Sequence, residues 1–483
     1  MRLGITLGAA AIALAVAAPV ADAFCGFYIN GSEQKMFNDA TQVVLMRQGT
    51  RTVLSMQNDF RGPLGDFAMV VPVPVVLQKE QVKTLPHDVF DRVDQLSAPR
   101  LVEYWEQDPC YVEPPVPRMM MMRGGGGPPV PSAPPRSDAD YGVKIEAQFK
   151  AGEYEVVILS AEQADGLERW LVDNNYKIPA GAADALAPYI RGGMKFFVAK
   201  VDIKEVKKDA HGKVVLSPIR FHYEEDQLRL PVRLGLLNAN GKQDLLLYVL
   251  HPESRFEAAN YANVFIPSNL EVLDEIRNDF GGFYAQLFDE TLAAAGGRAV
   301  VTEYAWQAGS CDPCPVPPLQ PGDIYTLGGD VFGEGAGDGP ARPMDRSQPF
   351  FGNASQWVLT RLHTRYDQKT LNEDLVFVPA GPVVGGRGSE GISREKPGAV
   401  EKDSVNNFQG RYIIRHYWAG EVKCDTPVWG RWGGPPDGGN KLQAAQDLAN
   451  APRGGMALSK VVQSALPQLK LPGLPVPERK KSN

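Results

Sequence analysis

Five cysteines are the residues of this sequence with the most distinctive chemistry. They are Cys25, Cys110, Cys311, Cys314 and Cys424. Two of them form the tetrapeptide Cys311-Asp-Pro-Cys314, and a Cys-x-x-Cys loop serves as a redox disulfide, as half of a tetrahedral zinc site or as a structural bridge. These three chemistries require different neighbours, so the residues around the tetrapeptide separate them.

The neighbours of the tetrapeptide favour a structural bridge. A thioredoxin-like site needs a thiolate at a helix N-terminus, and Pro315, Pro317 and Pro318 prevent a helix from starting there and continuing. Zinc needs further ligands at close spacing, and the sequence has no second Cys-x-x-Cys and no His-x-x-x-His. Pro315 also stands where haem attachment requires a histidine. We therefore predict a structural disulfide without metal or cofactor, and a thiol-redox role and a metal-binding role are the alternatives.

The histidines form no recognisable catalytic or metal-binding motif. They are His87, His211, His222, His251, His363 and His416, and none lies three or four residues from another. The sequence also lacks Gly-x-Ser-x-Gly, His-Glu-x-x-His and a P-loop. We expect packed histidines. An extracytoplasmic enzyme, such as a hydrolase, that uses one of them is the competing hypothesis, because folding brings distant residues together.

Aromatic and acidic clusters near the C-terminus each have two interpretations. Trp418, Trp429 and Trp432 either stack on a sugar or peptide ligand or cover the core beside Cys424. The glycine-rich stretch 328–339 contains three acids, but their spacing matches neither an EF-hand nor a β-roll. We expect a solvated loop there instead of a calcium site.

Length and composition predict a folded protein that does not bind nucleic acid. The chain has 483 residues, of which 43% are hydrophobic, and this apolar content excludes a wholly disordered chain. Lys+Arg 50 against Asp+Glu 57 gives a net charge of −7, whereas nonspecific nucleic-acid binding depends on cationic surfaces. Gly 49 and Pro 40 indicate many turns and long irregular surface loops.

The first residues predict export. Met1-Arg2 is followed by an uncharged apolar run over 3–21 and by Ala21-Asp22-Ala23, a small-x-small cleavage site. We expect a signal peptide over 1–23 and a periplasmic or extracellular mature protein. No later stretch has 18 uninterrupted apolar residues, so we expect no transmembrane segment in the mature chain.

Export makes disulfides the first interpretation of the cysteines. We expect Cys25 to pair with Cys110, and one of Cys311 and Cys314 to pair with Cys424. This pattern leaves one cysteine unpaired.

The pattern of apolar residues predicts an α+β fold with a mostly antiparallel sheet, a few helices and long Gly/Pro-rich surface loops. A β-hairpin is expected over 41–57 around Gln48-Gly49, a helix over 86–96 and a second helical piece over 101–106. Further helices are expected over 161–173, 182–190 and 282–294.

We divide the chain into six parts by composition. They are the signal peptide 1–23, an N-terminal β-rich part 24–112, a disordered Pro/Met/Gly loop 113–140, a central α+β part 141–310, a C-terminal Cys/Trp-containing β part 311–440 and a mobile tail 441–483. Met119–Met122 in the loop lack the spacing and the neighbouring His or Cys of a Cu(I) site.

Several motifs in one order resemble a bacterial family of exported proteins, domain of unknown function 2330. They are Cys25-Gly-Phe-Tyr, Val70-Val-Pro-Val-Pro74, Asp108-Pro-Cys110, Cys311-x-x-Cys314, Val358-Leu-Thr-Arg-Leu-His363, and Gly410-Arg-Tyr with Arg415-His416. The resemblance extends from Cys25 to Trp432 and implies an exported, cysteine-containing bacterial protein without assigning catalytic residues. From the signal sequence, the cysteines and the missing catalytic motifs, we expect a disulfide-stapled binding or structural module with a cell-envelope partner.

Overall fold

The computed structural model describes most of the chain. The described residues are 27–30, 37–61, 67–110, 143–174, 176–179, 181–202, 204–208, 214–238, 241–312, 314–332, 354–386, 397–435, 451 and 453–475. The expected signal peptide, Cys25 and the expected loop 113–140 lie outside these residues.

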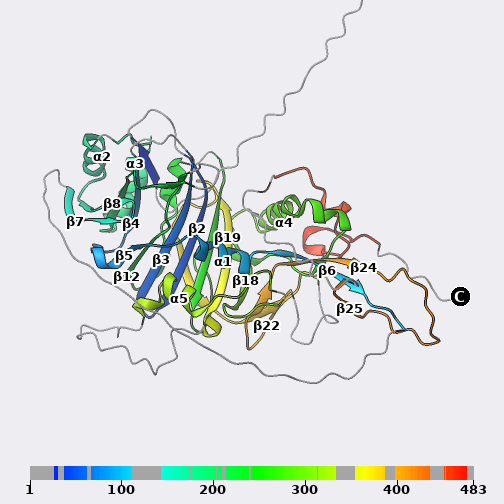
Figure 1. The fold of residues 1–483 in the computed structure, drawn as a ribbon. Coiled ribbons are helices and arrows are strands. Elements are labelled where there is room, and N and C mark those ends of the chain that lie inside the picture. Colours follow the sequence, from blue (N-terminus) through cyan, green and yellow to red (C-terminus); the bar gives the residue numbers. More distant parts are fainter. Residues whose placement is uncertain are drawn as a thin grey trace, which may run out of the picture.

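A large twisted sheet forms the centre of the molecule (Figure 1). Within the described residues it has 11 strands. Their order is β22 (Val400–Lys402), β21 (Val383–Gly385), β23 (Asn407–Gln409), β18 (Ala299–Gln307), β19 (Val358–Tyr366), β14 (Gln243–His251), β2 (Phe37–Gln48), β3 (Arg51–Arg61), β12 (Ile219–Glu224) and β5 (Val82–Thr84), with β16 (Ala262–Phe265) beside β18. Strands from the N-terminal, central and C-terminal parts of the chain thus share one sheet.

A second sheet packs on one face of the large sheet. Its order is β1 (Phe27–Asn30), β4 (Phe67–Val73), β9 (Lys195–Val201), β8 (Tyr154–Ala161) and β7 (Val143–Ala151). The apolar core between the sheets includes Leu45 and Met56 of the large sheet and Val71, Ile158 and Phe197 of the second. Helices α2 (Ala164–Asp173) and α3 (Ala182–Arg191) cover the outer face of the second sheet.

Other helices pack against the opposite face of the large sheet. Helices α1 (Asp88–Ser97) and α5 (Pro321–Leu327) share an apolar cluster with Val44 and Met46. Because β2 is buried on both faces, its run Val43–Met46 is apolar without alternation. Helix α4 (Phe280–Ala294) contacts Val301 of β18 and Tyr412 of the four-stranded sheet described next.

Three small sheets complete the described structure. The four-stranded sheet has the order β17 (Leu270–Glu271), β24 (Arg411–His416), β6 (Arg100–Glu106) and β25 (Trp432–Gly433). The three-stranded sheet has the order β13 (Leu228–Leu230), β20 (Leu375–Ala380) and β15 (Arg255–Ala258), and β10 (Lys207–Lys208) pairs with β11 (Val214–Val215). Most strand pairs are antiparallel, so the predicted α+β class is confirmed.

Local sequence signals predicted several elements well. The hairpin of β2 and β3 has Gln48 opposite Arg51, and Gly49 takes a positive φ of 58° in the two-residue turn. Helix α1 matches the helix predicted over 86–96. The helix predicted over 101–106 is wrong, because this segment forms β6 and pairs in parallel with β24, more than 300 residues later.

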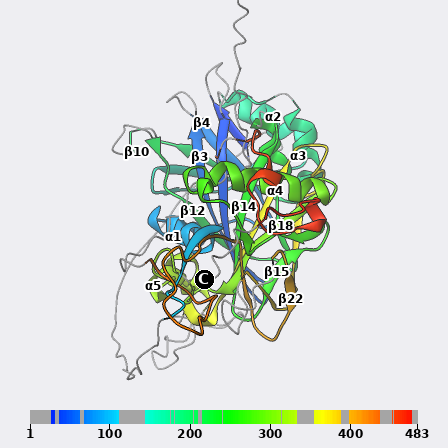
Figure 2. The same cartoon turned by 90° about the vertical axis from the view of Figure 1, so that its right-hand side faces the viewer.

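The C-terminal segment corrects another expectation. Residues 453–475, which belong to the expected mobile tail 441–483, form a strap against α4 (Figure 2). Val462 makes a β-bridge to Val272, and Leu458, Leu466 and Leu471 are buried in the cluster around α4. Apolar residues separated by irregular spacing carry no periodic signal, although they bury well in a strap that contains only two short 3-10 helices, Leu458–Lys460 and Pro467–Leu469.

No helix within the described residues combines the length and the apolar character needed to cross a bilayer.

Candidate functional site: a groove with one acidic residue at the end of the large sheet

A groove of about 400 Å³ opens where five chain segments meet at one end of the large sheet. This volume lies in the range of small-molecule sites. Its lining residues are Pro252, Glu253, Gln307, Ser355, Gln356, Val358, Pro382, Ser404, Val405 and Asn406.

One wall of the groove is held by the paired ends of β18 and β19. Gln307, the last residue of β18, lies opposite Val358, the first residue of β19. Beyond them, the N–H of Ala308 donates to the carbonyl of Trp357 at 2.7 Å. The chain then passes so close to the 354–356 turn that a Cβ on Gly309 would lie 2.5 Å from the Ser355 nitrogen. Only glycine allows this approach.

The other walls are turns held by hydrogen bonds from backbone N–H groups to side chains. The N–H of Val383 donates to Asn406 Oδ1 at 3.3 Å and connects the 404–406 turn to the Pro382 segment. In the turn after β14, the N–H groups of Glu253 and Ser254 both donate to His251 Nδ1 at 3.1 Å. Burial lowers the pKa of His251, which favours the neutral ring that accepts these bonds.

The lining of the groove combines apolar residues with polar side chains that make no hydrogen bond within the protein. Val405 is 53% exposed, and prolines and Val358 add to the apolar lining. Within the described structure, the side chains of Glu253, Gln307 and Gln356 make no hydrogen bond or ion pair. Glu253 is the single ionisable group among the lining residues. The groove therefore offers amide and hydroxyl hydrogen bonds and one negative charge.

The cysteine pairing differs from the expected pairing. Cys311 bonds to Cys314, with Cα atoms 5.0 Å apart, and Cys110 bonds to Cys424, with Cα atoms 5.5 Å apart. The pairing of Cys25 with Cys110, and of Cys311 or Cys314 with Cys424, is thus wrong. Cys110 and Cys424 each follow one strand of the parallel pair β6 and β24, so both chains arrive at the same end of that sheet.

The sequence was compared with families of known proteins, and one family matches most of the chain. A family model described as an uncharacterized protein conserved in bacteria (DUF2330) matches residues 19–378. The chain belongs to the DUF2330 family. No curated protein and no solved structure matches the chain significantly. The resemblance inferred from the motifs is confirmed, although the matched range ends before Gly410-Arg-Tyr and Arg415-His416.

The DUF2330 match covers part of the groove and one complete disulfide. Glu253, Gln307 and Gln356 lie within it, as do Cys311 and Cys314. The 404–406 turn, Cys424 and the three tryptophans lie beyond it.

The tryptophans lie in the C-terminal segment that carries Cys424 and do not line the groove. Trp432 lies edge-on to Tyr417 at 5.3 Å, and the Arg415 guanidinium lies 4.9 Å from the centre of the Trp432 ring. Gly420 packs so tightly against Trp418 that an added Cβ would lie 2.6 Å from this ring. Trp429 also has an internal contact and is half-buried. All three rings thus have internal packing partners, and their expected role in ligand stacking stays a prediction.

A carboxylate–histidine cluster involves strands β6 and β24 of the four-stranded sheet. Donor atoms of Glu103, Asp274 and His416 lie within 4.8 Å of one another, close enough to hold a metal ion. However, the Arg277 guanidinium donates to both carboxylates, and its Nη2 lies 3.5 Å from His416 Nε2. Burial alone raises the pKa of Glu103, but hydrogen bonds from Arg277 and His416 lower it. The cluster is an ion-pair network in which arginine supplies the positive charge.

A larger charged network is buried under α4, and sequence reasoning missed it. His363 Nδ1 lies 2.7 Å from Glu303 Oε1, and His363 Nε2 lies 3.0 Å from Asp244 Oδ1. Arg361 Nε donates to Glu303 Oε2 at 2.6 Å. Burial lowers the pKa of His363, but Glu303 and Asp244 raise it above its usual value, which favours imidazolium. In the sequence, this network is indicated only by the spacing of Arg361 and His363, because residues two apart on a strand point to the same face of the sheet.

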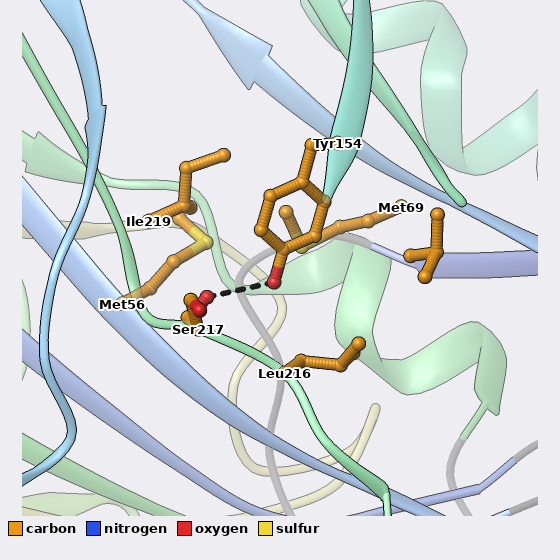
Figure 3. A pocket seen from close by; sticks show the side chains of 7 residues that line it. Met56, Met69, Tyr154, Leu216, Ser217 and Ile219 are labelled. Carbon is orange, nitrogen blue, oxygen red and sulfur yellow. Dashed lines mark hydrogen bonds between the residues drawn. The ribbon is translucent and has the colours of Figure 1, made fainter. Parts of the chain in front are cut away.

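A small cavity lies between the two large sheets (Figure 3). Met56, Met69, Tyr154, Leu216 and Ile219 are among its lining residues, and Tyr154 donates to the carbonyl of Ser217 at 2.7 Å. Its volume of about 10 Å³ holds at most one water molecule. The cavity is therefore a packing defect and not a ligand site.

Proposed function

We propose that this protein is exported and acts as a disulfide-stapled binding module of the cell envelope. Its groove binds an extended peptide segment that carries a basic residue. The observation that carries this proposal is the convergence on one groove of about 400 Å³ of three polar side chains, those of Glu253, Gln307 and Gln356, that make no hydrogen bond or ion pair within the described structure.

The chemistry of the groove favours a peptide over a saccharide. Amide side chains donate to and accept from peptide main-chain groups, and proline and valine form shallow apolar pockets for side chains. Saccharide sites commonly add an aromatic ring for stacking, and the lining residues of this groove include no aromatic residue. Glu253, as the one charged lining residue, favours a lysine or arginine on the ligand.

Export is supported by the leader-like composition of 1–23 and by the two disulfides. Disulfides form and persist mainly in oxidising compartments. The experiment is fractionation of the native bacterium followed by intact-mass analysis. We expect a chain that begins at Phe24 in the periplasmic or extracellular fraction. A cytosolic chain that retains Met1 would contradict export.

The Cys110–Cys424 bond supports the stapled part of the proposal. It links positions 314 residues apart and joins the ends of β6 and β24. In the chain-entropy account, a loop of this length stabilises the folded state by about 5 to 6 kcal/mol. The bond therefore keeps the segments that follow β6 and β24 together.

Peptide binding is tested with an array of immobilised ten-residue peptides that differ in their central residue, lysine, glutamine or glutamate. We expect lysine-centred peptides to retain the protein most strongly. The double variant Gln307→Ala/Gln356→Ala should lose at least about ten-fold in binding, because two sets of amide hydrogen bonds disappear. The matched control is Gln148→Ala, an exposed glutamine on β7 of the other sheet. Equal retention of the double variant and the control would overturn the proposal, as would an array without bound protein.

A further inference from the structure

We propose that the Cys311–Cys314 disulfide is a thiol–disulfide exchange site that a dithiol protein reduces while Cys110–Cys424 stays oxidised. This inference is independent of peptide binding. It concerns a different pair of atoms and is tested without a peptide.

The two disulfides differ in access and in span. Cys314 is exposed, and Cys311 is half-buried beside Val316 against the apolar cluster under α1 and α5. Cys110 and Cys424 are both half-buried, and their bond spans 314 residues instead of 3. Exposed disulfides exchange faster, and a short bridge contributes least to the stability of the fold.

The geometry assigns the order of the exchange. A thiolate of the partner attacks the exposed sulfur of Cys314, the Cys311–Cys314 bond breaks, and the Cys311 sulfur leaves as a thiolate that takes a proton. The second partner thiolate then attacks the partner sulfur of the mixed disulfide, and Cys314 leaves and is protonated. The partner dithiol is oxidised to a disulfide, and two electrons and two protons pass to Cys311 and Cys314.

Hydrogen-bond acceptors for the reduced pair are already in place. Cys311 Sγ lies 3.9 Å from the carbonyl oxygen of Val316, and Cys314 Sγ lies 3.0 Å from the carbonyl oxygen of Cys311. A thiol has an S–H donor that a disulfide sulfur lacks, so reduction adds donors that face these oxygens. The partial negative charge of the carbonyls favours thiols over thiolates. The pair is thus suited to accept electrons and not to attack other disulfides, which agrees with the prolines that exclude a thioredoxin-like helix.

Two hydrogen bonds hold the loop in addition to the bridge. The N–H of Leu319 donates to the carbonyl of Ala308 at 3.0 Å, which closes the loop at its base. Gln409 Nε2 donates to the carbonyl of Asp312 at 2.8 Å and holds its tip. Reduction therefore leaves the fold intact, as a reversible exchange requires.

The first experiment is a dithiothreitol titration of the folded Cys25→Ser protein, which removes the fifth cysteine from the readout. Free thiols are trapped with N-ethylmaleimide and located by peptide mapping. We expect Cys311 and Cys314 to become labelled at an at least ten-fold lower dithiothreitol concentration than Cys110 and Cys424. Reduction of both bonds together, reduction of Cys110–Cys424 first, or labelling of Cys311 and Cys314 only in urea would overturn the proposal.

The second experiment traps the exchange partner. The oxidised protein is incubated with a thioredoxin-class protein that lacks its resolving cysteine, so that the mixed disulfide accumulates. We expect the cross-linked peptide to contain Cys314. A cross-link to Cys110 or Cys424, or the absence of any cross-link while dithiothreitol still reduces the pair, would overturn the assignment of a dithiol protein as the reductant. Circular dichroism of the reduced protein checks that the fold is intact.

Discussion

Arg453 of the C-terminal strap donates from Nη2 to Asp244 Oδ1 of β14 at 2.8 Å, across 209 residues of sequence. Its Nη1 also donates to Asp289 Oδ1 of α4 at 2.7 Å. One guanidinium therefore ties the strap, the helix and the central sheet together, and it extends the buried network around Glu303 and His363 toward the surface.

Removal of Arg453 should destabilise the protein substantially. In Arg453→Met, Asp244 stays buried and loses one of its cationic partners, so we expect the free energy of unfolding to fall by about 2 to 4 kcal/mol. Urea denaturation measures this change. Lys460→Ala, at an exposed position of the same strap, is the control and should change stability by less than about 0.5 kcal/mol. If Arg453→Met and Lys460→Ala unfold at the same urea concentration, the strap is anchored only by its apolar residues.

The Glu303 carboxylate should make stability fall in acid. Burial alone raises the pKa of Glu303, but His363 and Arg361 favour its charged form and lower the value from 4.5 to about 2 in the folded protein. A lowered folded pKa contributes stability that is fully present above the unfolded value and is lost as the pH falls toward the folded value. We expect Glu303→Gln to be less stable than the wild type at neutral pH, and the difference should shrink as the pH falls from about 5 to about 2.

Urea titrations at several pH values measure this difference. Glu421→Gln, at an exposed side chain, is the control and should follow the wild type at every pH. A difference between Glu303→Gln and the wild type that does not change with pH would contradict the assigned charge of Glu303.

The two disulfides should contribute unequally to stability. Cys110→Ser/Cys424→Ser removes a bridge over 314 residues, and we expect a loss of about 3 to 5 kcal/mol, which is below the chain-entropy value because the reduced unfolded chain retains some structure. Cys311→Ser/Cys314→Ser opens a bridge between residues 3 apart and should cost at most about 2 kcal/mol. Thermal unfolding of each double variant is compared with that of the wild type. A larger loss of stability in Cys311→Ser/Cys314→Ser would contradict the proposal that Cys110–Cys424 is the main stabilising bond.

Gly309 should be essential to the shape of the groove. In Gly309→Ala the new Cβ would lie 2.5 Å from the Ser355 nitrogen, so the 354–356 turn must move. We expect a loss of about 1 to 3 kcal/mol in unfolding free energy together with weaker retention on the peptide array. Gly322→Ala is the matched control, because a Cβ on Gly322 meets no atom within 4 Å. Wild-type stability and binding of Gly309→Ala would mean that the turn adapts freely.

Glu253 should determine the charge preference of the groove. In Glu253→Lys we expect the array to retain glutamate-centred peptides more strongly than lysine-centred ones, an inversion of about ten-fold or more in their ratio. Fluorescence anisotropy with one labelled peptide of each kind quantifies the ratio. Glu421→Lys, which reverses a charge outside the groove, should leave it unchanged. If both charge reversals act alike, long-range electrostatics and not the groove governs binding.

Local patterns predicted the elements whose stabilising contacts are close in sequence. Gly49 indicated the β2–β3 turn, and the spacing of Val89, Val93 and Leu96 indicated α1, because positive φ and helical amphipathicity are properties of short segments. The pattern of apolar residues also predicted the α+β class, and the order of motifs identified the family, whose model matches residues 19–378.

Tertiary structure alone decided the cysteine pairing, the identity of β6 and the groove. Leu101–Glu106 forms a strand because β24 lies beside it, and the same pairing brings Cys110 to Cys424. The groove combines residues from Pro252 to Asn406, and Glu303 meets His363 only through the pairing of β18 with β19. A single sequence records the side chains of each segment, but the partners of a strand depend on long-range packing that local periodicity does not encode.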